Sequence, residues 1–153
     1  MTDLRNKYPG TMPIYKKSGA AQFTLMEPKY DENGRVTKNG GILLEVAASR
    51  GDNDKTYDWG SKISFAFGTT DFCQLFENPD APSKLIHSSP NGSTKSLEFQ
   101  PGTGKYAGTY MMNVGEKSAS GDFRKVNVPL SSGEYTVLLR LFMSAAPLII
   151  GWR

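Results

Sequence analysis

The sequence predicts an α+β fold in which antiparallel β-sheets carry segregated helices. Short segments of alternating apolar and polar residues, separated by Gly and Pro, indicate strands with one buried face. Two further segments carry helix-start signals, and each of them follows a run of such strands. Runs of strands that end in a helix are typical of antiparallel sheets, whereas strict alternation of single strands and helices would indicate a parallel sheet.

The predicted strands are short and separated by clusters of Gly, Asn, Asp and Pro. They comprise residues 22–26, 41–48, 61–67, 95–100, 106–114 and 123–128. We expect Phe65, Phe67 and Phe99 to lie in the core, because these rings recur on the apolar face of their strands.

The first helix is expected to run from Thr69 to about Glu77. Thr69 and Thr70 place hydroxyl groups where the first N–H groups of a helix need acceptors. Asn78-Pro79 should end the helix, because Pro lacks the N–H that a helix interior requires. Within this helix, Cys73 is expected to be a buried apolar thiol.

The second helix is expected from Ser131 to about Ala146, where Pro147 ends or kinks it. Ser131 and Glu134 have the spacing of a capping box. Between residues 135 and 150 the only charged residue is Arg140, so the helix is apolar on every side and needs cover on every side. A partner subunit is the expected cover, and wrapping by the chain itself is the alternative. The candidate oligomerisation residues are Val137, Leu138, Leu139, Phe142 and Met143.

The two helices divide the chain into similar parts, because residues 126–135 repeat the strand-to-helix order of residues 64–72. The expected units are an N-terminal segment at 1–14, taken as flexible, and a single domain at 15–153 made of halves at about 15–79 and 94–153, joined by a polar loop at 80–94.

Composition excludes several classes of site. The formal net charge of +3 permits a polyanionic partner without requiring one. Cys73 is the only cysteine and His87 the only histidine, so we expect no disulfide, no metal site, no other cofactor and no Ser/His/Asp catalytic set. His87 is expected to be a plain surface residue, and no enzymatic activity is predicted. The N-terminus does not resemble a targeting segment, so an intracellular protein is expected, with its compartment open.

Cationic and aromatic residues are interleaved, as single-stranded nucleic-acid binding requires, because cations follow phosphates and flat rings stack on unpaired bases. The candidate binding residues are Tyr15, Lys16, Lys17, Phe23, Arg50, Lys55, Tyr57, Trp59, Lys62, Lys95, Lys105, Tyr106 and Tyr110. For Tyr57, Trp59 and Tyr106, a role in the core is an equal alternative. Trp59 precedes Gly60 and is expected to face outward, whereas Trp152 is expected to be packed.

Four segments carry recognisable features: Tyr-Asp-Trp at 57–59, the strand segments at 95–101 and 106–114, and the closing segment at 135–152 with its Pro-x-x-x-Gly-Trp ending. As an ordered set, these segments resemble the Whirly family of single-stranded DNA-binding proteins. The matching segments span about residues 15 to 152. The family's Lys-Gly-Lys-Ala-Ala-Leu stretch is represented by residues 16–23, where Ala20 falls near the second lysine of the family.

The resemblance implies two antiparallel four-stranded sheets, each followed by a helix as a ββββα pseudo-repeat, with the helices packed at the centre of a homotetramer. It also implies that single-stranded DNA runs along the sheet edges between subunits, largely independently of sequence, in genome maintenance such as DNA repair or replication. Two alternatives stay open: an RNA-binding or annealing protein of the same fold, and a purely structural β-rich oligomer.

Overall fold

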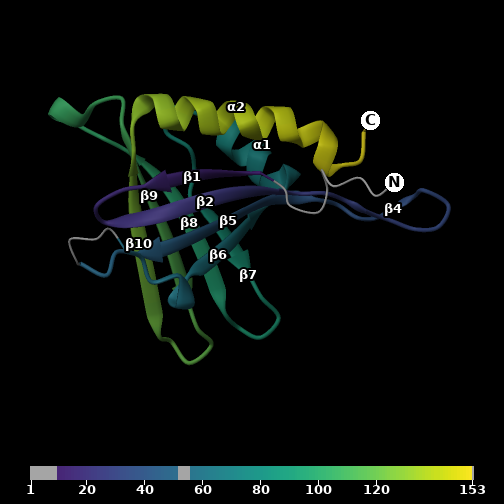
Figure 1. Ribbon diagram of the computed structural model, residues 1–153, viewed down its shortest axis with the longest axis horizontal. Helices are drawn as coiled ribbons and strands as arrows, with labels where there is room; N and C mark the ends of the chain where they lie inside the picture. The colour runs from purple at the N-terminus through teal and green to yellow at the C-terminus, as the bar shows by residue number, and fades with distance from the viewer. Residues whose placement is uncertain (1–9, 52–55, 153) are drawn as a thin grey trace.

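Two four-stranded antiparallel sheets pack against each other in the computed structural model, which describes residues 10–51 and 56–152 (Figure 1). The first sheet consists, in spatial order, of β1 (Thr11–Tyr15), β2 (Gly19–Met26), β5 (Gly41–Ala48) and β6 (Ile63–Phe67). The second sheet consists of β10 (Phe123–Leu130), β9 (Tyr110–Lys117), β8 (Thr94–Pro101) and β7 (Leu85–Ser88). A small hairpin formed by β3 (Lys29–Tyr30) and β4 (Val36–Lys38) projects beyond the first sheet (Figure 1).

Alternation along each strand divides the two faces of each sheet. In the first sheet, Phe23 pairs with Leu44, and Leu44 pairs with Phe65, so these residues form one buried row. The expected core positions Phe65, Phe67 and Phe99 are each about 1% exposed, which confirms that part of the prediction. The inner face of the second sheet contributes Leu97, Phe99, Met112, Val114, Val126 and Val128 to the same core.

Helix α2 (Ser132–Ile149) closes the core against both sheets, and helix α1 (Thr69–Glu77) lies beside it (Figure 1). The Phe142 ring centroid lies 4.8 Å from that of Phe67 and 5.1 Å from that of Phe72. At the other end of the helix, the Tyr135 ring lies 5.3 Å from Phe99 of the second sheet. One helix therefore joins the two sheets into a single core.

Helix α1 begins at Thr69 as predicted, but Gly68 is its N-cap and no hydroxyl caps it, so the predicted capping by Thr69 and Thr70 was wrong. The start of α2 follows from local chemistry. Ser131 and Glu134 form the predicted capping box: the Glu134 N–H donates to Ser131 Oγ, and the Ser131 N–H donates to a Glu134 carboxylate oxygen. The predicted end of α2 was wrong, because the helix continues through Pro147 to Ile149. Pro147 is exposed, so water can satisfy the carbonyl four residues earlier that lacks its usual N–H partner. None of the helices within the described residues is long and apolar enough to cross a membrane.

Strands β1, β3, β4 and β7 were absent from the sequence prediction. Strand β1 starts at Thr11, inside the segment expected to be flexible, where it pairs with β2 along its whole length and buries Ile14. Strand β9 begins four residues later than expected, at Tyr110. Residues 104–106 instead form a 3₁₀ turn, and the Gly102 N–H donates to the Thr109 carbonyl across this connection.

His87 lies on strand β7 and is half-buried, so its assignment to a polar loop as a plain surface residue was wrong. Its Nε2 lies 2.8 Å from Asp71 Oδ1, and its ring stacks on Phe65 at a centroid distance of 4.2 Å. The other oxygen of Asp71 accepts the Gly68 N–H at the start of α1. Strand β7 is thereby tied to the first turn of that helix.

Two further burial predictions were wrong. Cys73 is exposed, because Phe72 and Leu75 occupy the buried side of α1. Trp152 is 70% exposed, although the sequence predicts a packed ring. The chain turns at Gly151, which has φ +85° and lies so close to Val36 of the β3–β4 hairpin that a Cβ would clash with it. This turn directs Trp152 away from the core.

Candidate nucleic-acid interface

The outer face of the first sheet carries an aromatic cluster that rests on two small residues. Ala20 of β2 pairs with Ala47 of β5, and both are fully buried beneath Tyr57, with Trp59 packed against the same group. Larger side chains at these two positions would occupy the space that the Tyr57 ring fills. The two alanines therefore leave room for an aromatic ring to pack on a sheet face that is otherwise directed toward solvent.

Tyr57 is the buried support of this cluster, and Tyr15 is its accessible surface. Tyr57 is 9% exposed, and its hydroxyl donates to the Lys16 carbonyl at 2.7 Å. Tyr15 is 60% exposed, with its ring centroid 5.9 Å from that of Tyr57. Of the two alternatives given for Tyr57, its burial supports the role in the core, whereas Tyr15 is exposed and Trp59 is partly buried.

Two lysines lie beside this cluster in the β1–β2 turn. The Lys16 N–H donates to the Gly19 carbonyl, which fixes the turn, and Lys16 Nζ lies 2.7 Å from a Glu134 carboxylate oxygen. Lys17 is exposed and makes no ion pair within the described part of the chain. The turn therefore presents one paired and one unpaired cation.

Lys16 also lines a groove of about 670 Å³ between the β1–β2 turn, the β8–β9 connection and the start of α2. Tyr106 and Tyr110 line the same groove, so the fold brings together three predicted residues from distant positions. Tyr106 is 59% exposed, and Lys105 Nζ lies 5.2 Å from its ring centroid, within cation–π range. The groove thus offers an accessible ring with one cation beside it, Lys105, and a second cation, Lys16, in the lining.

Tyr110 forms a rigid wall of this groove. Its ring stacks on Tyr135 with a centroid distance of 3.7 Å, and its hydroxyl donates to the Asp80 carbonyl. The Tyr135 hydroxyl donates to the Pro79 carbonyl at 2.6 Å. Burial, with a smaller contribution from the charge of Asp80, raises the pKa of Tyr110. The pKa of Tyr135 is raised further, mainly by burial. Both hydroxyls therefore stay protonated donors at neutral pH.

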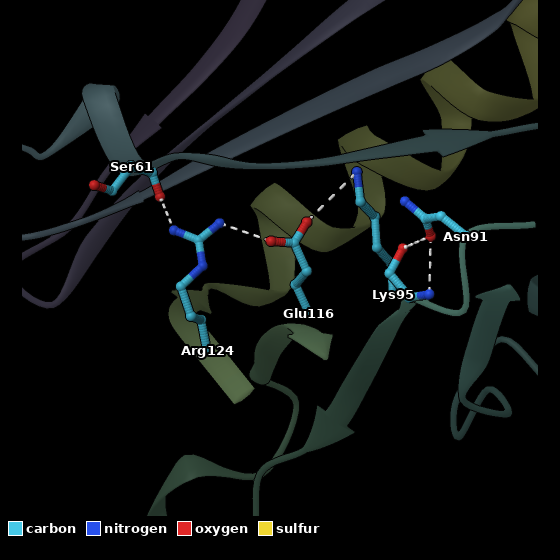
Figure 2. A network of polar contacts seen from close by, with 6 residues as sticks. Ser61, Asn91, Lys95, Glu116 and Arg124 are labelled. Atoms are coloured by element: carbon cyan, nitrogen blue, oxygen red, sulfur yellow. Dashed lines mark hydrogen bonds and ion pairs between the residues drawn. The ribbon is translucent and has the colours of Figure 1, made fainter. Parts of the chain in front are cut away.

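Two further predicted cations, Lys62 and Lys95, are engaged in ion pairs. Figure 2 shows Arg124 donating to the Ser61 carbonyl at 2.7 Å and to Glu116 at 2.8 Å, with Lys95 Nζ 3.8 Å from the second oxygen of Glu116. Arg124 thereby joins the second sheet to the short 3₁₀ helix that precedes β6 (Trp59–Ser61), whereas Lys95 pairs with Glu116 across two strands of the second sheet. Lys62 pairs with Glu45 on the outer face of the first sheet.

The remaining predicted binding residues are Phe23, Arg50 and Lys55. Phe23 is 5% exposed and packs against Phe67 and Phe142, so its assignment to the binding surface was wrong. Arg50 is exposed at the end of the first sheet, where its N–H donates to the Thr56 carbonyl. Lys55 lies outside the described residues.

The structure adds one accessible ring that the sequence prediction left out of the site. Phe123 is exposed on the outer face of the second sheet, where its ring lies over Gly115. A small groove there of about 110 Å³ also has Lys84 and Lys125 in its wall. The signal was available, because Phe123 directly precedes Arg124 and Lys125 and falls on the solvent side of β10 by alternation.

The predicted oligomerisation residues divide between two sides of α2. Leu138 and Phe142 are fully buried in the core of their own chain, so assigning them to a subunit contact was wrong. Helical periodicity places them on the same side as Tyr135, Ala145 and Ile149. Val137 and Met143 are exposed, as are Leu141 and Leu148, while Leu139 is partly buried. The uncovered side of α2 therefore carries large apolar side chains.

Comparison with known families decides where the chain belongs. The sequence model of the family described as Whirly transcription factor matches residues 14–141. The chain belongs to the Whirly family. Curated Whirly relatives from Arabidopsis thaliana include the single-stranded DNA-binding proteins WHY3 and WHY1, both chloroplastic, at 27% identity over 91% of this chain. The mitochondrial single-stranded DNA-binding protein WHY2 is 25% identical over the same share. The match spans 55%, 56% and 62% of the length of WHY3, WHY1 and WHY2.

Several solved structures share this fold. The crystal structure of Arabidopsis thaliana WHY1 superposes with a TM-score of 0.82 at 22% identity, covering 95% of this chain and 93% of that one. The plant transcriptional regulator PBF-2 gives 0.81 at 18% identity, covering 95% and 84%. A guide-RNA-binding protein complex bound to a gRNA is more distant, at 0.56 and 9% identity, covering 92% of each chain. At these identities the likeness establishes the Whirly fold alone.

Proposed function

We propose that this Whirly chain binds single-stranded DNA, largely independently of base sequence, and that binding is its activity in place of catalysis. The main support is a path of side chains. It runs from the Tyr15 and Trp59 rings, past Lys16 and Lys17, to the groove lined by Tyr106. Along this path, accessible rings alternate with cations. Rings can stack on unpaired bases of any identity while the cations contact the phosphates.

The same features favour a single strand over a duplex. In a duplex the base faces are stacked on each other, so exposed Tyr15 and Tyr106 rings would have no partner. No basic run exceeds two residues, which suits a few phosphate contacts better than a long duplex backbone. The curated relatives are named single-stranded DNA-binding proteins, and this proposal extends that activity to the present chain.

The proposed working form is a homotetramer in which α2 packs at the centre. The exposed apolar side chains of α2 (Val137, Leu141, Met143 and Leu148) support this, because a monomer would leave them in water. In this proposal the two sheet-and-helix halves act as a ββββα pseudo-repeat, and DNA follows the sheet edges between neighbouring subunits. Genome maintenance, including DNA repair or replication, is the setting in which such single strands arise.

RNA binding is the second candidate, supported by the shared fold of the guide-RNA-binding complex. Stacking on rings is common to both nucleic acids, so a preference must come from contacts to the ribose 2′-OH. A purely structural oligomer is a third reading, in which α2 is the only functional surface.

Fluorescence anisotropy with labelled oligo-dT, oligo-U and duplex DNA distinguishes these candidates. The expected result is tight binding of oligo-dT and weak binding of duplex. The slope of log K against log salt should be shallow, because each phosphate contact contributes only about 0.7 for single strands. Equal or tighter binding of oligo-U would favour the RNA reading, and binding to none of the three would leave only the structural one.

A further inference from the structure

We propose that Glu134 is an internal competitor for the phosphate-binding lysine Lys16 and thereby limits the affinity of the groove for nucleic acid. This inference rests on the proposed function and identifies how the same site is regulated. The relevant geometry joins the β1–β2 turn to the first turn of α2, where Lys16 Nζ lies 2.7 Å from Glu134 Oε1.

Lys16 is held in place before any ligand arrives. Its N–H bonds to Gly19, and its carbonyl accepts the Tyr57 hydroxyl, so its backbone is fixed at the edge of the groove. Its side chain and that of Glu134 are each 29% exposed, which leaves the ion pair accessible to a competing anion. A phosphate entering beside Tyr106 would meet an ammonium group that a carboxylate already neutralises.

Glu134 has two partners on the same oxygen. Oε1 accepts the Ser131 N–H at 2.8 Å to complete the capping box, and it also meets Lys16 Nζ. The cap needs only an acceptor atom, whereas competition with phosphate needs the negative charge. Glu134→Gln separates the two roles, because a glutamine amide oxygen can still accept the Ser131 N–H while the charge is lost.

Releasing Lys16 should strengthen binding to a single strand. We expect Glu134→Gln to bind oligo-dT roughly fourfold more tightly at about 0.15 M salt, with a slope of log K against log salt that is steeper by about 0.7, equivalent to one further phosphate contact. Glu32→Gln is the matched control, because it makes the same change in net charge on an exposed loop of the β3–β4 hairpin, at the opposite end of α2 from the groove (Figure 1). It should leave affinity and slope almost unchanged.

The double variant Lys16→Ala/Glu134→Gln tests whether the effect passes through Lys16. The gain from Glu134→Gln should vanish in the Lys16→Ala background. An equal gain in that background, or an equal gain from Glu32→Gln, would overturn the inference, since either result would indicate a general charge effect. Thermal melting and sedimentation velocity of each variant confirm that fold and assembly are retained.

A second comparison avoids any change to the helix cap. In the otherwise unaltered protein, Lys17→Ala should weaken oligo-dT binding more than Lys16→Ala, because Lys17 has no ion pair among the described residues and Lys16 is already neutralised. The reverse order would contradict the inference. If the unaltered protein fails to bind oligo-dT at all, the proposed function fails; if it binds and these variants do not follow the expected order, the role of Glu134 alone is excluded.

Discussion

The Tyr57 hydroxyl lies 2.7 Å from the Lys16 carbonyl, which joins two residues 41 positions apart in the chain. Tyr57 is buried on Ala20 and Ala47, and Lys16 lies at the edge of the groove. The bond therefore connects the aromatic cluster of the first sheet to the β1–β2 turn that presents the cations. Tyr57, the first residue of the Tyr-Asp-Trp segment, is thus a buried support of the candidate interface.

Removing the Tyr57 hydroxyl should lower the stability of the fold while the ring stays in place. Tyr57→Phe keeps the ring packed on Ala20 and Ala47 and removes one hydrogen bond, so the free energy of unfolding should fall by about 1 kcal/mol. Urea unfolding followed by circular dichroism measures this cost. Tyr15→Phe is the control, because the Tyr15 ring is exposed, and it should change stability by less than about 0.5 kcal/mol. Equal costs for the two variants would contradict the supporting role of Tyr57.

Exposed rings along the proposed DNA path should contribute to binding, whereas an exposed ring elsewhere should not. Tyr15→Ala and Tyr106→Ala should each weaken oligo-dT binding by about 1–3 kcal/mol, the range of a base-stacking contact. Trp59→Ala should fall in the same range, provided that melting shows an intact fold. Trp152→Ala is the matched control, because Trp152 is exposed but lies at the C-terminal end of α2, away from the groove. Normal binding by both tyrosine variants would exclude stacking at these rings.

The two sides of α2 should respond differently to charge. Leu141→Asp and Met143→Asp lie on the exposed side, so we expect folded subunits that no longer associate. Leu138→Asp places a carboxylate in the core and should prevent folding, because a buried unpaired charge is very costly. Sedimentation equilibrium at micromolar concentration measures the assembly. A monomer in the unaltered protein would exclude the proposed tetramer.

The carboxylate in the cap of α2 should make the stability of the fold depend on pH. Burial alone would raise the pKa of Glu134, but the hydrogen bonds from Lys16 and Ser131 outweigh it, so the pKa lies below its ordinary value of 4.5. A carboxyl group whose pKa is lowered by folding stabilises the protein above the unfolded pKa and loses that contribution as pH falls through the folded pKa. Glu134→Gln should therefore be less stable than the unaltered protein at pH 7, by less than about 1 kcal/mol for so exposed an ion pair. The difference should begin to shrink near pH 4.5 and vanish once the pH falls below the lowered pKa of the folded protein, and a difference independent of pH would exclude the ionic contribution.

Helix starts and central strands could be predicted because their signals are local. Ser131 and Glu134 are three residues apart, and the alternation of Phe65 and Phe67 is visible within one strand. Strands β1 and β7 lacked such signals. Pro13 interrupts the pattern of β1, and β7 contains His87, whose burial depends on Phe65 and Asp71 from other elements.

The sequence predicted which kinds of residue form the candidate binding surface, but only some of the individual residues. Lys16, Tyr106 and Tyr110 do meet at one groove, yet Phe23 and Tyr57 are buried. Whether a ring is exposed to stack on a base or is buried depends on the residues that it packs against. For Tyr57 these are Ala20 and Ala47, and their pairing follows from a register that no short segment specifies.

The position of Phe142 has a consequence for how the chain reaches its native state. Its ring packs against Phe23, Phe67 and Phe72, so the core of the first sheet is completed by a residue that follows the entire second sheet in sequence. Such contacts between distant residues require a large loop to close before they stabilise anything, which slows folding. Neither half should form a stable unit during synthesis until α2 has emerged, so the two sheets are expected to fold in one cooperative step.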